Sequence, residues 1–424
     1  MTVKDVILTI AIMLGAGLVS QLIADFARVP RMLVLLVAGA LLGPAASDAI
    51  DVPVDSMGAE LLLSLGVSFI LFHGGLQLST RVLSRVAVGL TLLAIPGVVF
   101  TAFIAGIVAA IAFGLPLTSG LLIGAVLAPT DPAILIPLFE RLGLRPKISQ
   151  TIIAESALND PTGAVLALAV SGVVISGSAS LTQPLQDFVV NLLISAALGV
   201  VFGVVLSAAV SSRRAGIWRE SSAIAVMAVI SAGYFSIDTA GGSGYLGAFL
   251  AGLIVGNMEQ LGLAMHSEHE RDMRVLVSTV ADVMVMFVFI TLGANIPWGD
   301  IRSELLPALA VVSALILLAR PFTVFLCLVP DRRGSWSREE LLFLAWTRET
   351  GVVPAALAGI MVGLHVPDAN LIVITVALAI IVTLSVQSTT KRWLARRLGL
   401  VDVMVPPSGP LPADGTSVVG ASAP

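Results

Sequence analysis

The chain has 424 residues, of which 57% are hydrophobic and only 12% are charged, and its formal net charge is −4. This composition excludes a soluble globular domain and indicates an integral membrane protein. The single cysteine, Cys327, excludes a fold held by disulfides. The slight acidity identifies no partner, and nucleic acid is not expected to be one.

Apolar segments that cross or nearly cross a bilayer follow one another along the chain. A tilted helix needs roughly 20 apolar residues to cross, so the sequence predicts about thirteen transmembrane helices in an all-α polytopic membrane protein. Two segments are short, which indicates tilted or re-entrant packing. The predicted segments are 5–23, 31–44, 58–77, 86–112, 116–138, 149–175, 187–211, 220–237, 244–257, 275–297, 304–329, 338–363 and 370–389.

Loop charges test this arrangement independently, because a missed helix would place every later connection on the wrong side. Alternate connections and the C-terminal tail, including Lys391, carry nearly all of the loop arginines and lysines. The remaining connections hold only Arg302, and the N-terminus holds only Lys4. This places the N-terminus outside and the C-terminus in the cytoplasm, with the lipid bilayer of the cell (inner) membrane around the chain.

Beyond a transmembrane domain at 1–400, the segment 401–424 is rich in Pro, Gly and Ser and predicts a disordered cytoplasmic tail. The chain contains no P-loop, and no cofactor is expected.

The fifth segment is interrupted at "APTDPA", residues 128–133. Pro129 and Pro132 each remove a helical N–H donor and clash with the preceding turn. A simple kink accounts for one proline, but not for Thr130 and Asp131 between two. Unwound backbone at membrane depth lines a cavity or is buried in protein, and its carbonyls suit a cation.

The twelfth segment has a second interruption at "RETGVVP", where Gly351 and Pro354 follow two charges. Segments five and twelve match if 5–175 and 220–389 are repeats of six helices joined by a linker helix at 187–211. Seven crossings separate equivalent helices, so the repeats have opposite orientation. This pattern is typical of an inverted-repeat secondary transporter in which broken helices five and twelve cross in the core.

Several charged residues lie inside apolar segments, where each costs a few kcal/mol unless it is paired or faces water. They are Asp131, Glu155, Asp160, Arg320, Arg348 and Glu349. Together they indicate a polar site in the bundle interior. The alternative is a set of structural ion pairs with residues that reach the interface, and Arg348 with Glu349 is the first such candidate.

The stretch "ESALNDPTGAV", residues 155–165, has a definite helical geometry. Glu155 and Asn159 lie four residues apart on one stripe, and Ser156 and Asp160 lie four apart on the next. Ser156 and Asp160 can therefore present two oxygens to one object while Glu155 points elsewhere. Hard cations take carboxylate, hydroxyl and carbonyl oxygens, so this spacing favours a cation site.

At these residues the sequence resembles the NhaP-type sodium/proton antiporters of the monovalent cation:proton antiporter family. The Asn-Asp pair preceded by Glu-Ser is the most specific of the matching motifs. The motifs are "APTDPA", "ESALNDPTGAV", "ILFHGGLQL" at 70–78, "LGAFLAGLIVGN" at 246–257, "FVFITLGANI" at 287–296 and "LLARPF" at 317–322.

The resemblance implies exchange of a monovalent cation for a proton by alternating access in a homodimer. Sodium is the expected cation, with K⁺ and Li⁺ as alternatives. Asp160 would be the shared cation and proton carboxylate, with Ser156 and the Thr130 main chain as further ligands. Glu155 is included in this cation- and proton-binding group.

The resemblance also implies supporting roles around the break. Asn159 would tie the crossing of the broken helices, and Asp131 would lie among half-helix N-termini, whose dipoles a carboxylate offsets. Glu155 would pair with Arg320 in the core.

The charge count predicts electroneutral exchange of one cation for one proton. Every site carboxylate except Asp160 has an expected partner: Arg320 for Glu155, helix N-termini for Asp131 and Arg348 for Glu349. Proton and cation then compete for one negative charge.

Two positions depart from the family. His73 stands where an acidic residue usually precedes the glycine pair, and it is either a pH-sensitive group or a packing histidine. Thr350 takes the place of the familiar arginine, with Arg348 two residues earlier. Both changes leave the selectivity open.

Two other functions compete with antiport. A cation channel could share the polar residues, although buried carboxylates at a broken crossing suit alternating access better. "GGSG" at 241–244 matches rhomboid-type intramembrane serine proteases, with Ser243 as nucleophile and His73 as base, but it also fits a closely packed turn. "HSEHE" at 266–270 lacks the zinc-protease order and is expected to be a solvated cytoplasmic loop or a pH sensor.

Overall fold

The structure is a computed structural model that describes residues 3–27, 29–50, 52, 56–131, 144–177, 182–212, 216–332 and 334–401. Within these ranges the regular structure is helical, and the one bridge joins Leu144 to Val401. Nine of the described helices are long and apolar enough to span a membrane, and four shorter apolar helices accompany them. The predicted all-helical polytopic class is therefore confirmed, whereas the number of thirteen crossings stays a prediction.

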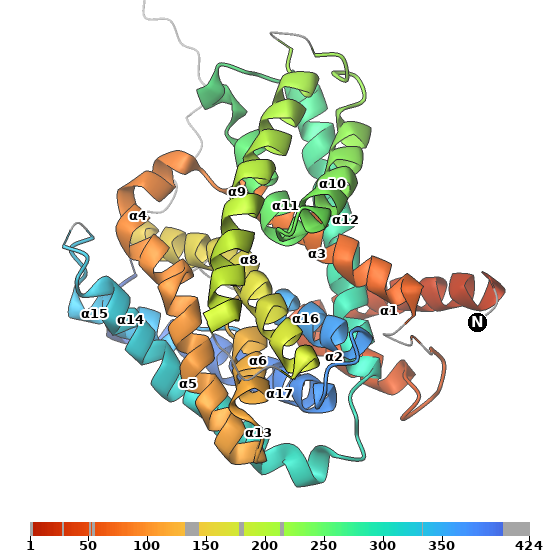
Figure 1. Ribbon diagram of the computed structural model, residues 1–424, viewed down its shortest axis with the longest axis vertical. Helices are drawn as coiled ribbons and strands as arrows, with labels where there is room; N and C mark the ends of the chain where they lie inside the picture. The colour runs from red at the N-terminus through yellow and green to blue at the C-terminus, as the bar shows by residue number, and fades with distance from the viewer. Residues whose placement is uncertain are drawn as a thin grey trace, which may run out of the picture.

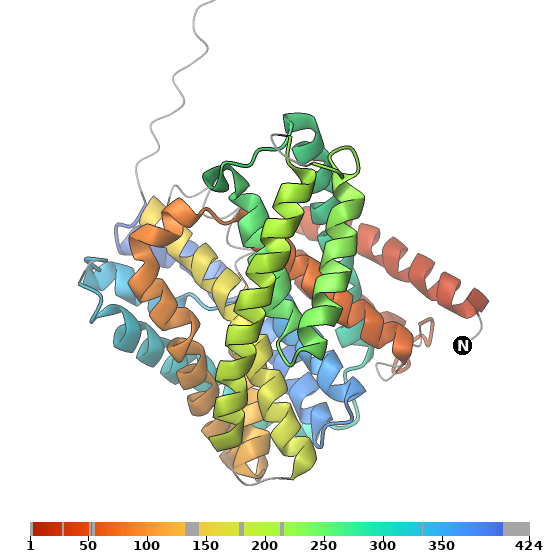
Figure 2. The same cartoon turned by 45° about the horizontal axis from the view of Figure 1, so that its top comes forward.

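The helices form two bundles that lie side by side (Figures 1 and 2). We call the first the scaffold bundle. It contains α1 (Val3–Ala27), α2 (Arg31–Leu42), α3 (Met57–Gln77), α9 (Thr182–Val210), α10 (Ser222–Thr239), α11 (Gly244–Gly256), η1 (Met258–Leu261) and α12 (Ser267–Ala294).

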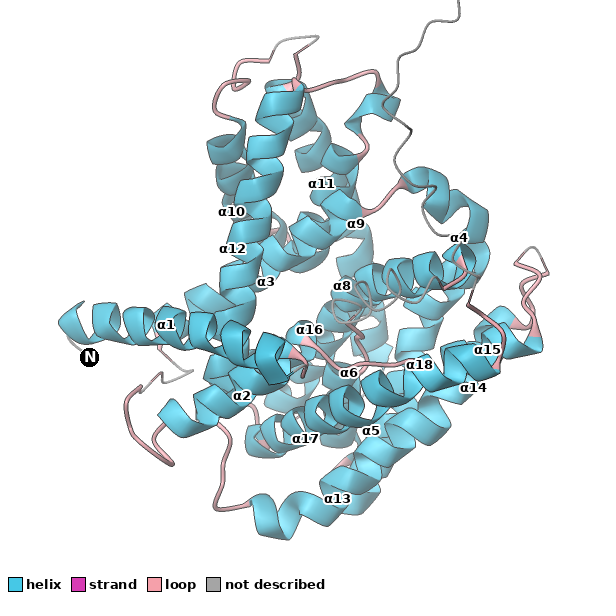
Figure 3. Ribbon diagram, turned by 180° about the vertical axis from the view of Figure 1, so that it is seen from behind, coloured by secondary structure: helices cyan, strands magenta, loops and turns pink. Residues whose placement is uncertain are grey.

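The second, which we call the crossing bundle, is seen from behind in Figure 3. It contains α4 (Thr80–Ala94), α5 (Pro96–Phe113), α6 (Leu117–Leu127), α8 (Pro146–Ser176), α13 (Ile301–Ala314), η2 (Leu315–Ala319), α14 (Arg320–Leu328), α15 (Arg338–Trp346), α16 (Val352–Gly363), α17 (Ala369–Val382), η3 (Thr383–Gln387) and α18 (Ser388–Arg397).

Glycines let the scaffold helices touch backbone to backbone. A Cβ added at Gly39 of α2 would lie 2.1 Å from the Ile290 carbonyl oxygen of α12. In the same way, a Cβ at Gly252 of α11 would lie 2.1 Å from the Phe72 carbonyl oxygen of α3. The facing helices carry matching glycines, Gly293 and Gly75. Small residues of this kind allow close packing where lipid removes the hydrophobic drive between helices.

These two contacts are equivalent to each other when the two predicted repeats are exchanged. The second predicted segment of each half, α2 or α11, packs on the third segment of the other half, α12 or α3. Such reciprocity is what inverted repeats require. The division into repeats at 5–175 and 220–389 with a linker at 187–211 stays a prediction, and α9 covers the linker.

Both predicted interruptions are present in the crossing bundle. The helix α6 ends at Leu127, and Ala128–Asp131 continue without helical structure, with Pro129 among them. Pro132 lies outside the described residues. The second interruption covers 347–351 between α15 and α16.

Two boundaries differ from expectation, and a third lies almost wholly outside the described residues. Pro354 was expected at the second interruption, but it lies in the first turn of α16, where a missing N–H costs nothing because those donors have no partner within the helix. The stretch "HSEHE" is not a loop, since α12 begins at Ser267 with acidic residues in its first turn. The predicted tail at 401–424 lies outside the described residues apart from Val401.

Candidate functional site

The two interruptions touch each other, and each sends a charged side chain to the other. The Asp131 N–H donates to the Glu349 carbonyl oxygen at 3.1 Å. The Asp131 carboxylate accepts from the Val352 N–H at 3.2 Å, so it caps the N-terminus of α16. A Cβ at Gly351 would lie 2.0 Å from the Asp131 carboxylate, which explains the glycine there.

Arg348 makes the reciprocal contact at the end of α6. Its Nη2 donates to the Ala128 carbonyl oxygen at 3.0 Å and also to the Leu127 carbonyl oxygen. A cation at a helix C-terminus and an anion at a helix N-terminus each match the helix dipole. The crossing therefore holds one charge of each sign against the helix end that favours it.

Asn159 of α8 ties this crossing to the helix that carries the remaining site residues. Its Oδ1 accepts from the Thr130 N–H at 3.2 Å, and its Nδ2 donates to Thr130 Oγ1 at 2.8 Å. The Ser156 hydroxyl lies 2.8 Å from the same Thr130 oxygen. All three side chains are buried. The structure therefore brings together Thr130, Ser156 and Asn159 as a connected polar cluster.

Asp160 is the residue of α8 that follows Asn159, and it is half-buried. Its Oδ1 is buried and has no hydrogen-bond partner among the described residues. A carboxylate oxygen left in this way inside a membrane protein is costly unless a proton or a cation binds it. Asp160 thus brings a buried carboxylate oxygen without a described hydrogen-bond partner next to this cluster.

Glu155 and Arg320 lie together as a buried ion pair. Arg320 Nη2 donates to Glu155 Oε2 at 2.9 Å, and Nη1 donates to Oε1. Both side chains are only 4% exposed. Arg320 Nε also donates to the Leu344 carbonyl oxygen at 2.9 Å. Both oxygens of Glu155 are therefore engaged by the Arg320 guanidinium.

The expected pairing of Glu349 with Arg348 is wrong. Glu349 forms an ion pair with Lys391 of α18, and both side chains are fully buried. Sequence reasoning counted Lys391 with the cytoplasmic charges, because a lysine just after an apolar run is typical of a membrane boundary. The signal in the sequence that Lys391 lies in the interior was the polar Gln387 one turn earlier. In the structure, Gln387 Nε2 donates to the Trp346 carbonyl oxygen at 2.8 Å beside the interruption.

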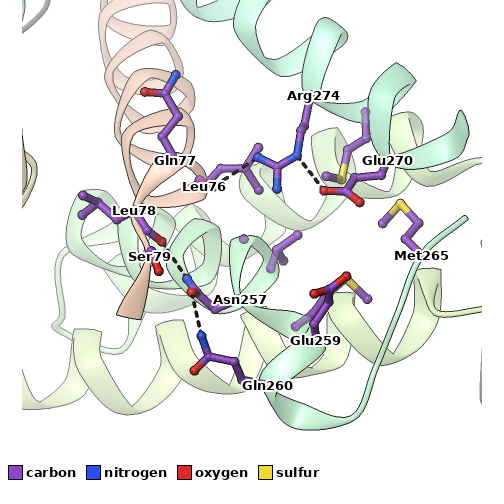
Figure 4. A pocket seen from close by; sticks show the side chains of 14 residues that line it. Leu76, Gln77, Leu78, Ser79, Asn257, Glu259, Gln260, Met265, Glu270 and Arg274 are labelled. Carbon is purple, nitrogen blue, oxygen red and sulfur yellow. Dashed lines mark hydrogen bonds and ion pairs between the residues drawn. The ribbon is translucent and has the colours of Figure 1, made fainter. Parts of the chain in front are cut away.

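His73 and the α3–α4 connection lie apart from this cluster. His73 Nε2 is 2.7 Å from Gln77 Nε2. Gln77 lines a cavity of about 350 Å³ at the ends of α3 and α11 (Figure 4). There Asn257 donates to the Leu78 carbonyl oxygen at 2.7 Å and accepts from the Thr80 N–H at 3.0 Å. Asn257 therefore holds the chain where it passes from the scaffold bundle into the crossing bundle.

Comparison with known proteins agrees with this arrangement. The family model described as the transmembrane sodium/hydrogen exchanger matches residues 8–397. The chain is 30% identical over 370 residues to Na(+)/H(+) antiporter 1 of Methanocaldococcus jannaschii, covering 85% of this chain and 83% of that protein. It is 31% identical over 401 residues to K(+)/H(+) antiporter NhaP2 of Shewanella sp. (strain ANA-3), covering 92% of this chain.

The chain spans 66% of the length of that second relative. Among solved structures, the sodium proton antiporter MjNhaP1 from M. jannaschii at pH 8 superposes with a TM-score of 0.80 at 27% identity. The superposition covers 93% of this chain and 99% of that one. Over 93% of its length, the chain therefore has the fold of the solved antiporter.

Proposed function

The chain belongs to the sodium/hydrogen exchanger family, and from that membership we propose that it is a secondary active antiporter, not an enzyme, that exchanges a monovalent cation for a proton. The observation that carries this proposal is Asp160, whose Oδ1 has no partner within the described residues beside two touching helix interruptions. A single carboxylate that binds either a proton or a cation is sufficient for coupled exchange, because each cargo excludes the other.

The surrounding residues support this role. Ser156 Oγ and the oxygens of Thr130 lie in the polar cluster next to Asp160 and supply the oxygen ligands that a hard cation prefers. Asn159 positions Thr130 through two hydrogen bonds. Alternating access then requires the crossing bundle to move against the scaffold bundle. Asn257 would hold the α3–α4 connection between the two bundles in place during this movement.

Sodium is the proposed cation, and K⁺ is the second candidate because the Shewanella relative is named a K(+)/H(+) antiporter. We also propose electroneutral exchange, a homodimer, no cofactor, and a place in the inner membrane with the N-terminus outside. The loop arginines and lysines support that orientation.

Proton efflux from reconstituted vesicles, triggered separately by Na⁺, K⁺ and Li⁺, tests the exchange and ranks the cations. Asp160→Asn is expected to remain folded and to lose cation-driven proton movement entirely, because the amide cannot carry a proton or neutralise a cation. Asp300→Asn, at an exposed position before α13, is the matched control and should exchange normally. Retained exchange by Asp160→Asn would remove this carboxylate from the mechanism.

A further inference from the structure

The "GGSG" motif forms a tight turn between α10 and α11. Gly241 has φ +81°, which favours glycine, and a Cβ at Gly242 would lie 2.9 Å from Ile194 Cγ2 and 3.0 Å from Ser195 Oγ. The Ser243 N–H donates to the same Ser195 hydroxyl at 2.6 Å. The prediction of a closely packed turn is confirmed.

The hydroxyl of Ser243 is not used by this turn. The residue is only 4% exposed, and its Oγ has no hydrogen-bond partner in the part of the chain that the structure describes. Ser243 lines a cavity of about 480 Å³. Asn191 of α9 and Asp238 of α10 line the same cavity, whose described walls contain no histidine. A serine nucleophile would lack its base there, whereas the oxygens present suit a cation.

Asp238 connects this cavity to a second one. It also lines a cavity of about 200 Å³ with Glu60, Tyr234 and Tyr245. The Asp238 side chain is exposed, and no described arginine or lysine forms an ion pair with it. Its exposed carboxylate therefore lines both cavities.

The far wall of the larger cavity is the helix that carries Asp160. Val165, Leu168, Ala169 and Gly172 of α8 form this wall. Five residues separate Val165 from Asp160, which corresponds to about 7.5 Å along the helix axis. The cavity thus lies beyond Asp160 toward the C-terminal end of α8, and residues of the scaffold helices α9 and α10 line it from the other side. Figure 2 shows these three helices.

We propose that Asp238, Ser243 and Asn191 form an outer capture site that binds the transported monovalent cation on its way to or from Asp160. The site offers a carboxylate, a buried unpartnered hydroxyl and an amide oxygen, which are the ligand types of hard cations. An exposed carboxylate without an ion pair among the described residues also raises the local cation concentration. The proposal rests on the proposed antiport and on the proposed orientation, in which this face is external.

Sided transport kinetics test this capture site. Proteoliposomes are sorted by the accessibility of a C-terminal tag, and Na⁺ or K⁺ is titrated from one face at a time. Asp238→Asn is expected to raise the half-saturating cation concentration about fivefold on the external face, the effect of losing up to about 1 kcal/mol from an exposed charge contact. The cytoplasmic half-saturation and the maximal rate should stay unchanged, since Asp160 remains intact.

Three variants sharpen the result. Asp238→Glu keeps the charge and should behave as wild type, Ser243→Ala should shift the external half-saturation in the same direction, and Asp300→Asn should not shift it. An unchanged external value for Asp238→Asn, or an equal shift on both faces, would overturn the capture site while antiport stands. Absence of cation-driven proton movement in the wild type would instead overturn the antiport itself.

Discussion

The scaffold bundle and the crossing bundle both pack helices through glycines, but among the described residues only the crossing bundle also buries ion pairs. In the scaffold, α2 meets α12 and α3 meets α11 through glycines, so that backbone lies against backbone. The crossing bundle contains the same kind of contact, since a Cβ at Gly124 of α6 would lie 2.1 Å from the Ala102 carbonyl oxygen of α5. It also buries two ion pairs, Glu155 with Arg320 and Glu349 with Lys391. Close packing alone stabilises helix pairs in lipid, whereas each buried charge is costly. The costly chemistry is therefore concentrated in the bundle that carries the candidate site.

The largest expected effect comes from breaking a buried pair in the crossing bundle. Arg320→Gln leaves Glu155 ionised and uncompensated, so the free energy of unfolding should fall by roughly 3–5 kcal/mol. Thermal unfolding in detergent measures this loss. Glu155→Gln combined with Arg320→Gln should recover part of it, because neither charge then remains. Arg302→Gln, at an exposed site, is the control, and strictly additive losses in the double variant would show that the two charges do not interact.

A smaller effect is expected in the scaffold bundle. A Cβ at Gly75 would lie 2.1 Å from the Phe249 carbonyl oxygen of α11, so Gly75→Ala must push α3 and α11 apart, at a cost of about 1–3 kcal/mol.

The neighbouring glycine provides a matched control. A Cβ at Gly74 meets nothing within 4 Å, so Gly74→Ala should be neutral or slightly stabilising in the same unfolding experiment. Equal behaviour of the two variants would mean that glycine contact does not hold the scaffold together.

The sequence predicted the parts of the site that break a local pattern. A proline pair cannot continue a helix, and polar residues in an apolar segment need partners, so Thr130, Asp131 and Asn159 were identifiable without a structure. Partners distant in the chain were harder to predict. The family resemblance implies the pairing of Glu155 with Arg320, and the isolated position of Arg320 in an apolar run supports it. Lys391 lies beside other basic residues and gives no such signal.

The wrong pairing of Arg348 with Glu349 has a geometric cause. The interruption at 347–351 is not helical, and Thr347 has extended dihedral angles. In an extended chain, successive side chains point to opposite sides. Arg348 therefore reaches the end of α6 while Glu349 faces α18. Adjacency in sequence predicts contact only where the local backbone conformation is known.

We expect the membrane potential to have no effect on the rate of exchange, which is the smallest of the predicted effects. The observed contacts pair every buried charge at the crossing except that of Asp160: Glu155 with Arg320, Glu349 with Lys391, and Asp131 and Arg348 at opposite helix ends. In the proposed exchange, Asp160 carries either a proton or a monovalent cation, so the moving site has the same net charge in both directions, and Asn159 beside it cannot ionise. An empty, ionised Asp160 would be costly to move through an apolar passage, so only the loaded site should cross.

In vesicles with a fixed cation gradient, proton flux should be equal whether the membrane potential is held at zero or negative inside. The potential is set with an ionophore-permeant ion that the protein does not transport. A flux that scales with the potential would mean that a second charge moves uncompensated, and the Glu349–Lys391 pair and Asp131 would be the first groups to neutralise.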